Sequence, residues 1–130
     1  MRRTLVNPWS YPEGLDQGIL IEGHRRLLFV SGQCAVSAEG ESLYPNDIGA
    51  QTEAALDNVA AVLERAGMDL GNIVRMNTYV TDVDAFFDHA AERMSERLEA
   101  FDVRPPGVLA GVVRLGRPEL LVELEAFAAD

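Results

Sequence analysis

Apolar and polar residues alternate along this chain with a period that changes along its length. Residues 18–22 and 27–31 are short apolar runs on either side of a polar step (Gly-His-Arg-Arg), and this arrangement predicts a β-hairpin. Residues 34–36 are a candidate continuation of the second run beyond a polar interruption. Residues 37–46 show no regular period and are predicted to form a loop.

From residue 47 the spacing becomes that of an α-helix. Asp47 is suited to cap the N-terminus of this helix and Gly67 to end it. Between them, apolar or small residues recur every three or four positions, which predicts an amphipathic helix with one buried stripe. The stripe consists of Ile48, Thr52, Ala55, Val59, Val62 and Ala66, thickened by Leu56 and Leu63.

A strand and a second helix are predicted next. Residues 73–80 alternate between apolar and polar, so that every second side chain shares one face: Val74, Met76, Thr78 and Val80. Thr81 or Asp82 could cap the second helix. Its predicted buried side consists of Phe86, Phe87, Ala90, Met94 and Leu98.

The last apolar segments predict a C-terminal hairpin. After a proline-broken stretch, strands are expected at about 108–114 and 120–127, joined by a polar turn. Glu123 and Glu125 lie on one face of the second strand, about 6–7 Å apart by strand rise. A carboxylate in a partly buried pocket can act as a general acid or base. The alternative is that both face solvent or pair with arginines, and for Glu125 this structural role is the preferred interpretation.

The order of these elements, ββ(β)αβαββ, predicts one α+β domain spanning residues 1–130. Two helices are expected to pack on one face of a mixed sheet. Two helices in so short a chain cannot cover both faces of the sheet. The other face therefore predicts self-association.

Charge narrows the range of partners. The chain carries 21 acidic and 11 basic residues, a net charge of -10. Nucleic-acid binding depends on cations that neutralise phosphates, and the sequence has no basic cluster, so nucleic acid and anionic membranes are disfavoured as partners. No run of about 18 apolar residues is present, and the N-terminus lacks the apolar core of a secretion signal. With a single cysteine as well, we expect a cytoplasmic protein.

Cys34, His24 and His89 are further candidates for chemistry. A nucleophilic cysteine needs a nearby cation or base to lower its pKa, and neither histidine is placed beside Cys34 by sequence. A small buried residue is its default interpretation. Two histidines without ligand spacing predict no metal site, and no organic cofactor is implied.

Four segments, in order and spacing, resemble the RidA (YjgF, endoribonuclease L-PSP) family. They are Phe-Val-Ser-Gly-Gln at 29–33, the helical Gln-Thr-x-x-Ala-Leu-Asp-Asn at 51–58, Val-Arg-x-x-x-Tyr-Val-Thr-Asp at 74–82, and the stretch 104–126. Each is weak alone, but together they cover about residues 18 to 128. The resemblance implies a chorismate-mutase-like fold, assembled as a barrel-like homotrimer with a small-molecule pocket at each subunit interface.

The resemblance also implies a chemistry, the hydrolysis of reactive imines or enamines to 2-oxo acids and ammonia. In the family an arginine that follows the Arg/Tyr/Phe-Pro step holds the substrate carboxylate, a task suited to a bidentate guanidinium. Gly107 stands at that position here. Losing a charged partner for a desolvated carboxylate should cost about 2–5 kcal/mol. Arg104 and Arg117 could supply a replacement cation, although a solvated loop charge is the simpler interpretation.

Other pocket positions match the family unevenly. Glu123 corresponds to the glutamate that positions the attacking water, and Ser31 to a pocket serine. Leu15 falls in the family's Gly-Pro-Tyr segment, so the tyrosine is missing, and Tyr11 could replace it only through a different loop path. Ala90 stands where the family has an asparagine. We therefore expect substrate contacts from Ser31, Gly107, Leu15, Ala90 and Tyr11, with Glu123 as the catalytic candidate.

Three functions remain open from the sequence. The first is a hydrolytic deaminase acting on an imine or enamine other than the standard 2-imino acids, with Glu123 activating water. The second is a ligand-binding or regulatory protein that has kept the pocket and lost the chemistry. The endoribonuclease activity that one family name records ranks last, because the chain is acidic.

Overall fold

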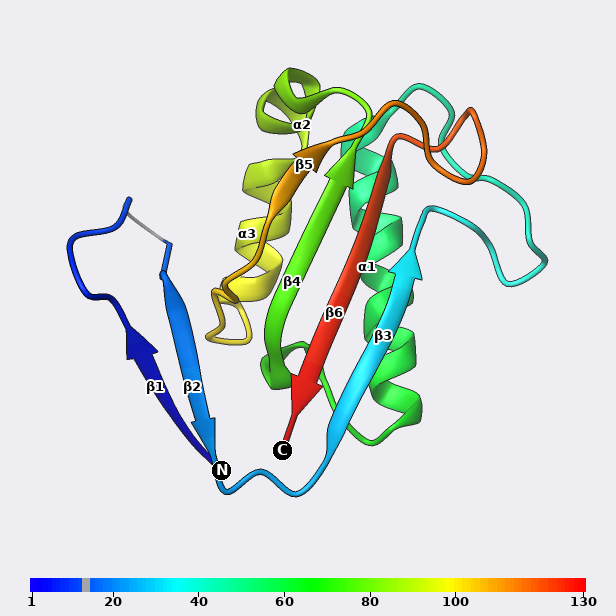
Figure 1. Cartoon of the computed structure of the whole chain (residues 1–130). Helices are drawn as coiled ribbons and strands as arrows, with labels where there is room; N and C mark the ends of the chain where they lie inside the picture. The colour runs from blue at the N-terminus through cyan, green and yellow to red at the C-terminus, as the bar shows by residue number, and fades with distance from the viewer. Residues whose placement is uncertain (13–14) are drawn as a thin grey trace.

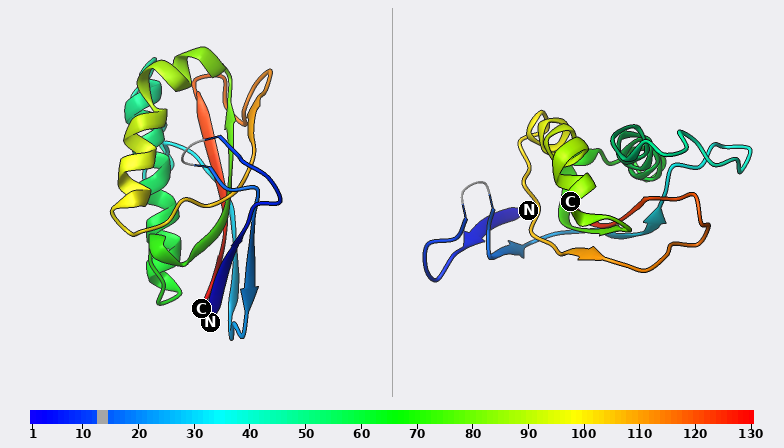
Figure 2. Two further views of the ribbon diagram at one scale, coloured as in Figure 1. Left: turned by 90° about the vertical axis from the view of Figure 1, so that its left-hand side faces the viewer. Right: turned by 90° about the horizontal axis from the view of Figure 1, so that it is seen from above.

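The computed structural model describes residues 1–12 and 15–130, and its centre is a four-stranded sheet covered by helices on one face (Figures 1 and 2). The strand order is β3-β6-β4-β5. These strands are β3 (Leu27–Gln33), β4 (Ile73–Val80), β5 (Leu109–Gly111) and β6 (Val122–Ala129). β6 is antiparallel to both its neighbours, whereas β5 is parallel to β4. The predicted α+β architecture, with a mixed sheet and helices on one side, is confirmed.

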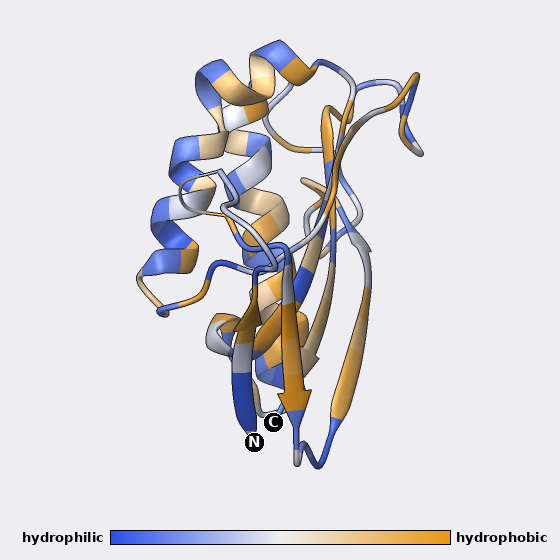
Figure 3. Cartoon of the chain, turned by 60° about the vertical axis from the view of Figure 1, so that its left-hand side comes forward, coloured by the Kyte–Doolittle hydropathy of each residue, from blue (hydrophilic) through white to orange (hydrophobic). Residues whose placement is uncertain are grey.

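The first helix, α1 (Ile48–Arg65), forms as its spacing predicts. The Asp47 carboxylate accepts a hydrogen bond from the Ala50 amide, and Gly67 ends the helix at a φ of 75°. The predicted stripe packs on the sheet, and its wider members Leu56 and Leu63 are fully buried. Figure 3 shows the resulting bands of apolar and polar residues on the helices.

The second predicted helix is divided into α2 (Val83–His89) and α3 (Ala91–Glu99). Asp82 caps α2 as predicted, and Phe86 is buried. The prediction that Phe87 is buried is wrong, because it is 60% exposed. In a helix of two turns, only a narrow stripe faces the core, and Phe87 lies about 100° around from Phe86. The break occurs where the His89 carbonyl approaches Gly49 of α1, at which a Cβ would lie only 2.7 Å from that oxygen.

The predicted N-terminal hairpin is wrong in its pairing. β2 (Gly18–Glu22) pairs antiparallel with β1 (Arg2–Val6), a strand that the sequence patterns did not predict, and β3 pairs with β6 instead. β1 and β2 form a separate two-stranded ribbon beside the main sheet (Figure 1). The candidate continuation at 34–36 is reduced to a single bridge between Val36 and Ser42.

The predicted C-terminal hairpin is also wrong, because β4 lies between β5 and β6. β5 has three residues and runs parallel to β4, which separates it from β6. β6 instead occupies the interior of the sheet. Its inward positions are fully buried (Val122, Leu124, Ala126 and Ala128), and a strand with such a face is best placed between two partners.

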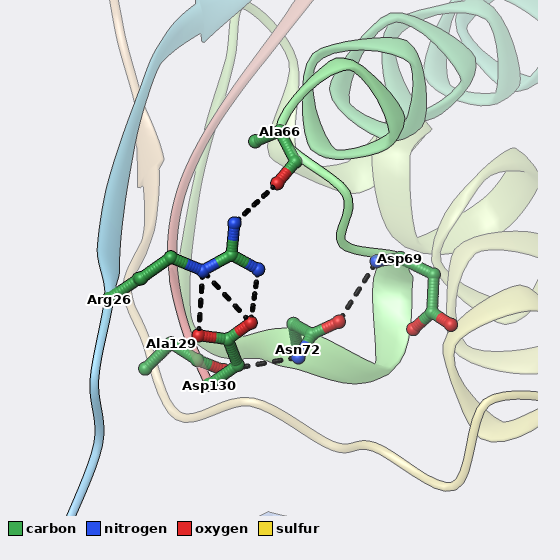
Figure 4. A network of polar contacts seen from close by, with 6 residues as sticks. All are labelled: Arg26, Ala66, Asp69, Asn72, Ala129 and Asp130. Carbon is green, nitrogen blue, oxygen red and sulfur yellow. Dashed lines mark hydrogen bonds and ion pairs between the residues drawn. The ribbon is translucent and has the colours of Figure 1, made fainter.

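A polar network at the end of β6 fixes the β3–β6 pair (Figure 4). The Arg26 guanidinium forms an ion pair with Asp130 and donates from Nη1 to the Ala66 carbonyl at the end of α1, at 2.9 Å. Hydrogen bonds from Arg26 hold the pKa of the Asp130 carboxyl below its usual value. Asn72 donates to the Ala129 carbonyl at 3.2 Å. A cleft lies at the opposite end of the same strand pair.

No described segment covers the sheet face away from the helices (Figure 2). Phe29 is 70% exposed there and contacts Phe127 edge to face, with ring centroids 5.6 Å apart. Val108 is 49% exposed. Exposed aromatic and aliphatic groups on one sheet face are typical of a surface that another chain covers. Among the described residues no helix is both long and apolar enough to cross a membrane.

Candidate functional site

A cleft of about 580 Å³ lies where β3 ends and β6 begins. It is lined by the strand residues Gly32, Gln33 and Glu123, by the α1 residues Asn58, Ala61 and Val62, and by two loops that contribute Cys34, Val36, Ser37, Ala38, Gly116, Arg117 and Leu120. We call it the Glu123 cleft. It combines a carboxylate, a thiol, an amide and a guanidinium on a partly apolar wall, which is typical of small-molecule sites.

Glu123 is positioned by its strand, β6, and by the absence of a side chain at Gly32, which lies opposite it. It stands in β6 between two fully buried residues, which fixes the backbone around it. A Cβ on Gly32 would lie 2.6 Å from the Glu123 Cδ atom. The glycine therefore leaves the space through which the glutamate side chain crosses the end of β3.

Cys34 is the hydrogen-bond partner of Glu123. Its Sγ lies 3.3 Å from Glu123 Oε1 and donates to it. Burial, followed by this hydrogen bond and the nearby negative charge, raises the pKa of the Cys34 thiol to about 12. Cys34 is thus a neutral donor and not a thiolate nucleophile. The sequence predicted a buried residue, whereas the structure places a half-buried thiol in the cleft.

We expect Cys34 to react slowly with thiol reagents in the folded protein. With its pKa raised to about 12, the Cys34 thiol is almost entirely protonated near neutral pH, so little reactive thiolate is available. The rate of reaction with a dithiobis-nitrobenzoate reagent, followed by absorbance at neutral pH, should rise steeply when urea unfolds the chain. Equal rates in the folded and unfolded protein would contradict this assignment.

The loops of the cleft are held by two polar side chains of α1, seven residues apart and so on one side of the helix. Asn58 Nδ2 donates to the Cys34 carbonyl at 2.8 Å and to the Val36 carbonyl at 3.0 Å. Gln51, fully buried, donates to the Glu119 carbonyl and accepts from the Leu121 amide. Both loops are therefore anchored to a rigid helix. This explains the Gln…Asn spacing that carries part of the family resemblance.

Arg117 brings a cation to the same cleft. It is half-buried, and its Nη1 donates to the Gly40 carbonyl at 2.9 Å and to Ser42 Oγ at 3.0 Å. Ser42 in turn donates to Glu119 Oε1 at 2.8 Å, and this hydrogen bond is the main reason why the pKa of Glu119 is lowered. Of the two loop arginines considered from sequence, only Arg117 lines the cleft, whereas Arg104 lines cavities on the helix side.

Glu125 has the structural role preferred from sequence, although its partners are not arginines. It accepts from Tyr79 OH at 2.7 Å and from Asn77 Nδ2 at 2.8 Å. These hydrogen bonds, Tyr79 first, lower the pKa of Glu125. Asn77 Oδ1 also accepts from the Val108 amide at 3.0 Å. The carboxylate is therefore part of the packing between β4, β6 and the segment before β5.

The other predicted contact residues do not line the Glu123 cleft as far as the structure describes it. Ser31 is exposed in β3, directly before Gly32. Leu15 is 59% exposed and lines a separate cavity of about 130 Å³, and Tyr11 is 46% exposed. Ala90 belongs to the hydrophobic core at 1% exposure. Their contact with a ligand stays a prediction. Gly14, matched to the same family segment as Leu15, lies outside the described residues.

Gly107 has a structural reason to be glycine. The flanking carbonyls of Pro106 and Val108 accept from the Met76 and Thr78 amides at 3.1 and 2.8 Å, so this segment runs against β4. A Cβ at position 107 would lie 1.6 Å from the Met76 carbonyl oxygen. The backbone path here thus excludes any side chain, an arginine included.

No group of three or more histidine, cysteine, aspartate or glutamate side chains suited to a metal ion occurs in the part of the chain that the structure describes. Glu123 and Cys34 form a pair and lack a third such ligand in that part. The chemistry offered by the cleft is therefore proton transfer and hydrogen bonding by Glu123, with Arg117 as the positive charge.

The chain is similar to known proteins in sequence and in fold. Residues 16–130 match the family model described as endoribonuclease L-PSP. The chain is 30% identical over 118 residues to the 2-iminobutanoate/2-iminopropanoate deaminase of Escherichia coli K12, which covers 91% of this chain and 85% of that protein. The matched residues include all those that line the Glu123 cleft.

Solved structures give the same result. A conserved Rid family protein of unknown function from Yersinia pestis, YyfB, superposes with a TM-score of 0.79 at 30% identity over the full length of both chains. The YjgF gene product of E. coli superposes with a TM-score of 0.70 at 31% identity, covering 92% of this chain and 90% of that chain. This likeness confirms the fold that the sequence resemblance implied.

Proposed function

The chain belongs to the endoribonuclease L-PSP family, also called RidA or YjgF, and we propose that it hydrolyses a reactive imine or enamine in the Glu123 cleft. The deaminase of E. coli to which it is similar is named for 2-iminobutanoate and 2-iminopropanoate. What carries the proposal for this chain is one observation. A partly buried carboxylate, held by a neutral thiol donor, faces a cleft large enough for a small metabolite.

The main group that imine hydrolysis requires from the protein is one that transfers protons, and this carboxylate can do so. Water adds to the C=N carbon, and Glu123 takes the proton of that water and passes it to the imine nitrogen, which gives a carbinolamine. Glu123 then transfers the hydroxyl proton of the carbinolamine to the nitrogen, the C–N bond breaks, and ammonia leaves a carbonyl compound. The balance is one imine and one water giving one carbonyl compound and one ammonia. Oε1 of Glu123 is engaged by Cys34, and Oε2 accepts no hydrogen bond from another described residue. Oε2 is the oxygen that we assign to the water.

The substrate that we propose is not a standard 2-imino acid. The family position that clamps the carboxylate of such compounds is Gly107, where no side chain fits. Leu15 and Ala90 also depart from the family's tyrosine and asparagine. The segments that carry the family resemblance are kept, whereas the residues at the family's substrate-contact positions are changed. A different small carbonyl-derived imine is the consequence that we draw.

The test compares two kinds of imine. One kind is 2-iminobutanoate, formed in situ by an amino-acid oxidase, and the other is an imine that carries its carboxylate away from the C=N carbon, formed in situ from the corresponding amine by a flavin-dependent amine oxidase. Both are followed by trapping with semicarbazide, with the E. coli deaminase as reference. We expect accelerated hydrolysis by this chain, with turnover of 2-iminobutanoate well below that of the E. coli protein. Turnover of 2-iminobutanoate equal to that of the reference would contradict the argument from Gly107, and no acceleration of any imine would contradict the proposed activity.

Two other functions correspond to distinct outcomes. Saturable binding of a small molecule without turnover would indicate a ligand-binding or regulatory protein, the second candidate, which the altered pocket lining favours. Cleavage of RNA by this chain, after contaminating nucleases have been removed, would support the endoribonuclease function. We rank it last, because the net charge of -10 opposes binding to a polyanion.

We further propose that the functional form is a homotrimer. The exposed Phe29 and Val108 on the uncovered sheet face support an assembly in which other copies cover that face. Such an assembly is also the way in which Leu15, Tyr11 and Ser31 could join a ligand site that one chain leaves open.

A further inference from the structure

The guanidinium of Arg117 is half-buried in the Glu123 cleft and is only partly used by the protein. Its Nη1 donates to two acceptors, the Gly40 carbonyl and Ser42 Oγ, and so both of its hydrogens are engaged. The opposite edge, formed by Nε and Nη2, donates to no acceptor among the described residues. That edge carries two parallel N–H groups in the arrangement that a carboxylate accepts bidentately.

Arg117 has no ion-pair partner among the residues that the structure describes, although the chain is rich in acids. The ion pairs between described residues are Arg2–Glu22, Arg26–Asp130, Arg93–Glu53 and Arg97–Asp57. Glu119 is reached only through Ser42, and Glu123 is turned towards Cys34. A half-buried cation without a direct counter-ion attracts an anion more strongly than a solvated one, because screening by water is weaker.

The position of Arg117 is fixed before any ligand arrives. The Glu119 carbonyl and the Leu121 amide, which follow it in the loop, are both bonded to the buried Gln51. The contacts of Arg117 to Gly40 and Ser42 tie the same loop to the neighbouring one. A preorganised donor spends little conformational entropy on binding.

We propose that Arg117 is the anion-binding residue of the Glu123 cleft and that its ligand is a small carboxylate, bound through the Nε–Nη2 edge. This proposal rests on the proposed function in one respect, the identification of this cleft as the substrate site. It names the charged group of that substrate, a carboxylate placed further from the C=N carbon than in a standard 2-imino acid. The carboxylate is then held from the loop before β6 and not from position 107.

The experiment measures binding alone, so that it is independent of turnover. The probes are butanoate and its neutral isostere butanamide, titrated at constant ionic strength into ¹⁵N-labelled protein and followed by amide NMR shifts. We expect saturable shifts at Gly32, Cys34 and Gly116 with butanoate and none with butanamide. Arg117→Gln should weaken butanoate binding about tenfold or more, since a hydrogen-bonded charge is lost. Arg117→Lys, which keeps the charge without the fork, should weaken it less.

Matched variants separate the possible failures. Arg104→Gln removes a loop arginine outside the Glu123 cleft and should leave butanoate affinity unchanged. Equal binding of butanamide, unchanged affinity in Arg117→Gln, or shifts that never saturate would each overturn the proposal.

If butanoate binds through Arg117 but no imine is hydrolysed, the proposed function fails and the anion site stands. If imines are hydrolysed at the same KM by Arg117→Gln, the anion site fails and the function stands.

Discussion

Replacing Gly107 with alanine should lower the free energy of unfolding by about 3 kcal/mol. The added Cβ would lie 1.6 Å from the Met76 carbonyl oxygen, which belongs to the backbone of a central strand and cannot rotate away. Either β4 or the segment 106–108 must shift. A shift breaks the hydrogen bonds that Met76 and Thr78 donate to Pro106 and Val108. Urea unfolding followed by circular dichroism measures the effect.

A matched glycine provides the control. Gly116→Ala introduces the same methyl group in a loop where nothing lies within 4 Å of the new Cβ. Its free energy of unfolding should stay within about 0.5 kcal/mol of the parent protein. A loss below about 1 kcal/mol in Gly107→Ala would show that the segment has room for a side chain. The glycine would then have removed the arginine side chain without any change in the backbone path.

The consequence reaches beyond stability. If the backbone excludes a side chain, Gly107→Arg cannot restore the family's carboxylate clamp, and the variant should fold poorly instead of gaining activity on 2-imino acids. The glycine and the path of the chain past β4 have then changed together. The anchor of the substrate must then be sought among the residues that line the Glu123 cleft, of which Arg117 is the cation.

The fold could be predicted from sequence where its determinants are local. The stripe of α1, the caps at Asp47 and Asp82 and the alternation of β4 depend on residues within one or two turns, and all three are confirmed. Strand pairing depends on partners far along the chain. Polar turns between apolar runs predicted two hairpins, yet in both cases a strand pairs elsewhere, because the buried face of β6 requires neighbours on both sides.

The site divides in the same way. Glu123 could be identified because it lies in a segment that resembles the family. Its partner Cys34 is 89 residues away, and no sequence pattern near either residue predicts their contact. Arg117 could be seen as a spare loop cation. That its loop faces Glu123 follows only from the bonds that Gln51 and Asn58 make across the fold. Gly107 was recognised as an absence, whereas the reason for that absence is the backbone of β4.

Glu123→Gln should reduce kcat for imine hydrolysis about 10²–10⁴-fold while leaving the fold intact. Glutamine keeps the shape that fits over Gly32, and its amide oxygen can still accept from Cys34 Sγ. What it cannot do is accept a proton from the attacking water. The loss should therefore appear in kcat, with a smaller change in KM, and thermal unfolding should remain near that of the parent protein.

Glu125→Gln is the matched control, because it makes the same change two residues along the same face of β6. Its carboxylate is bonded to Tyr79 and Asn77 and not to the cleft, so its replacement should alter stability more than turnover. Unchanged kcat in Glu123→Gln would remove the proposed base. Equal losses in both variants would mean that the negative charge of this sheet face, and not the carboxylate at the cleft, sets the rate. Only a loss confined to Glu123 assigns the proton transfer to this acid, which the fold places against both Gly32 and Cys34.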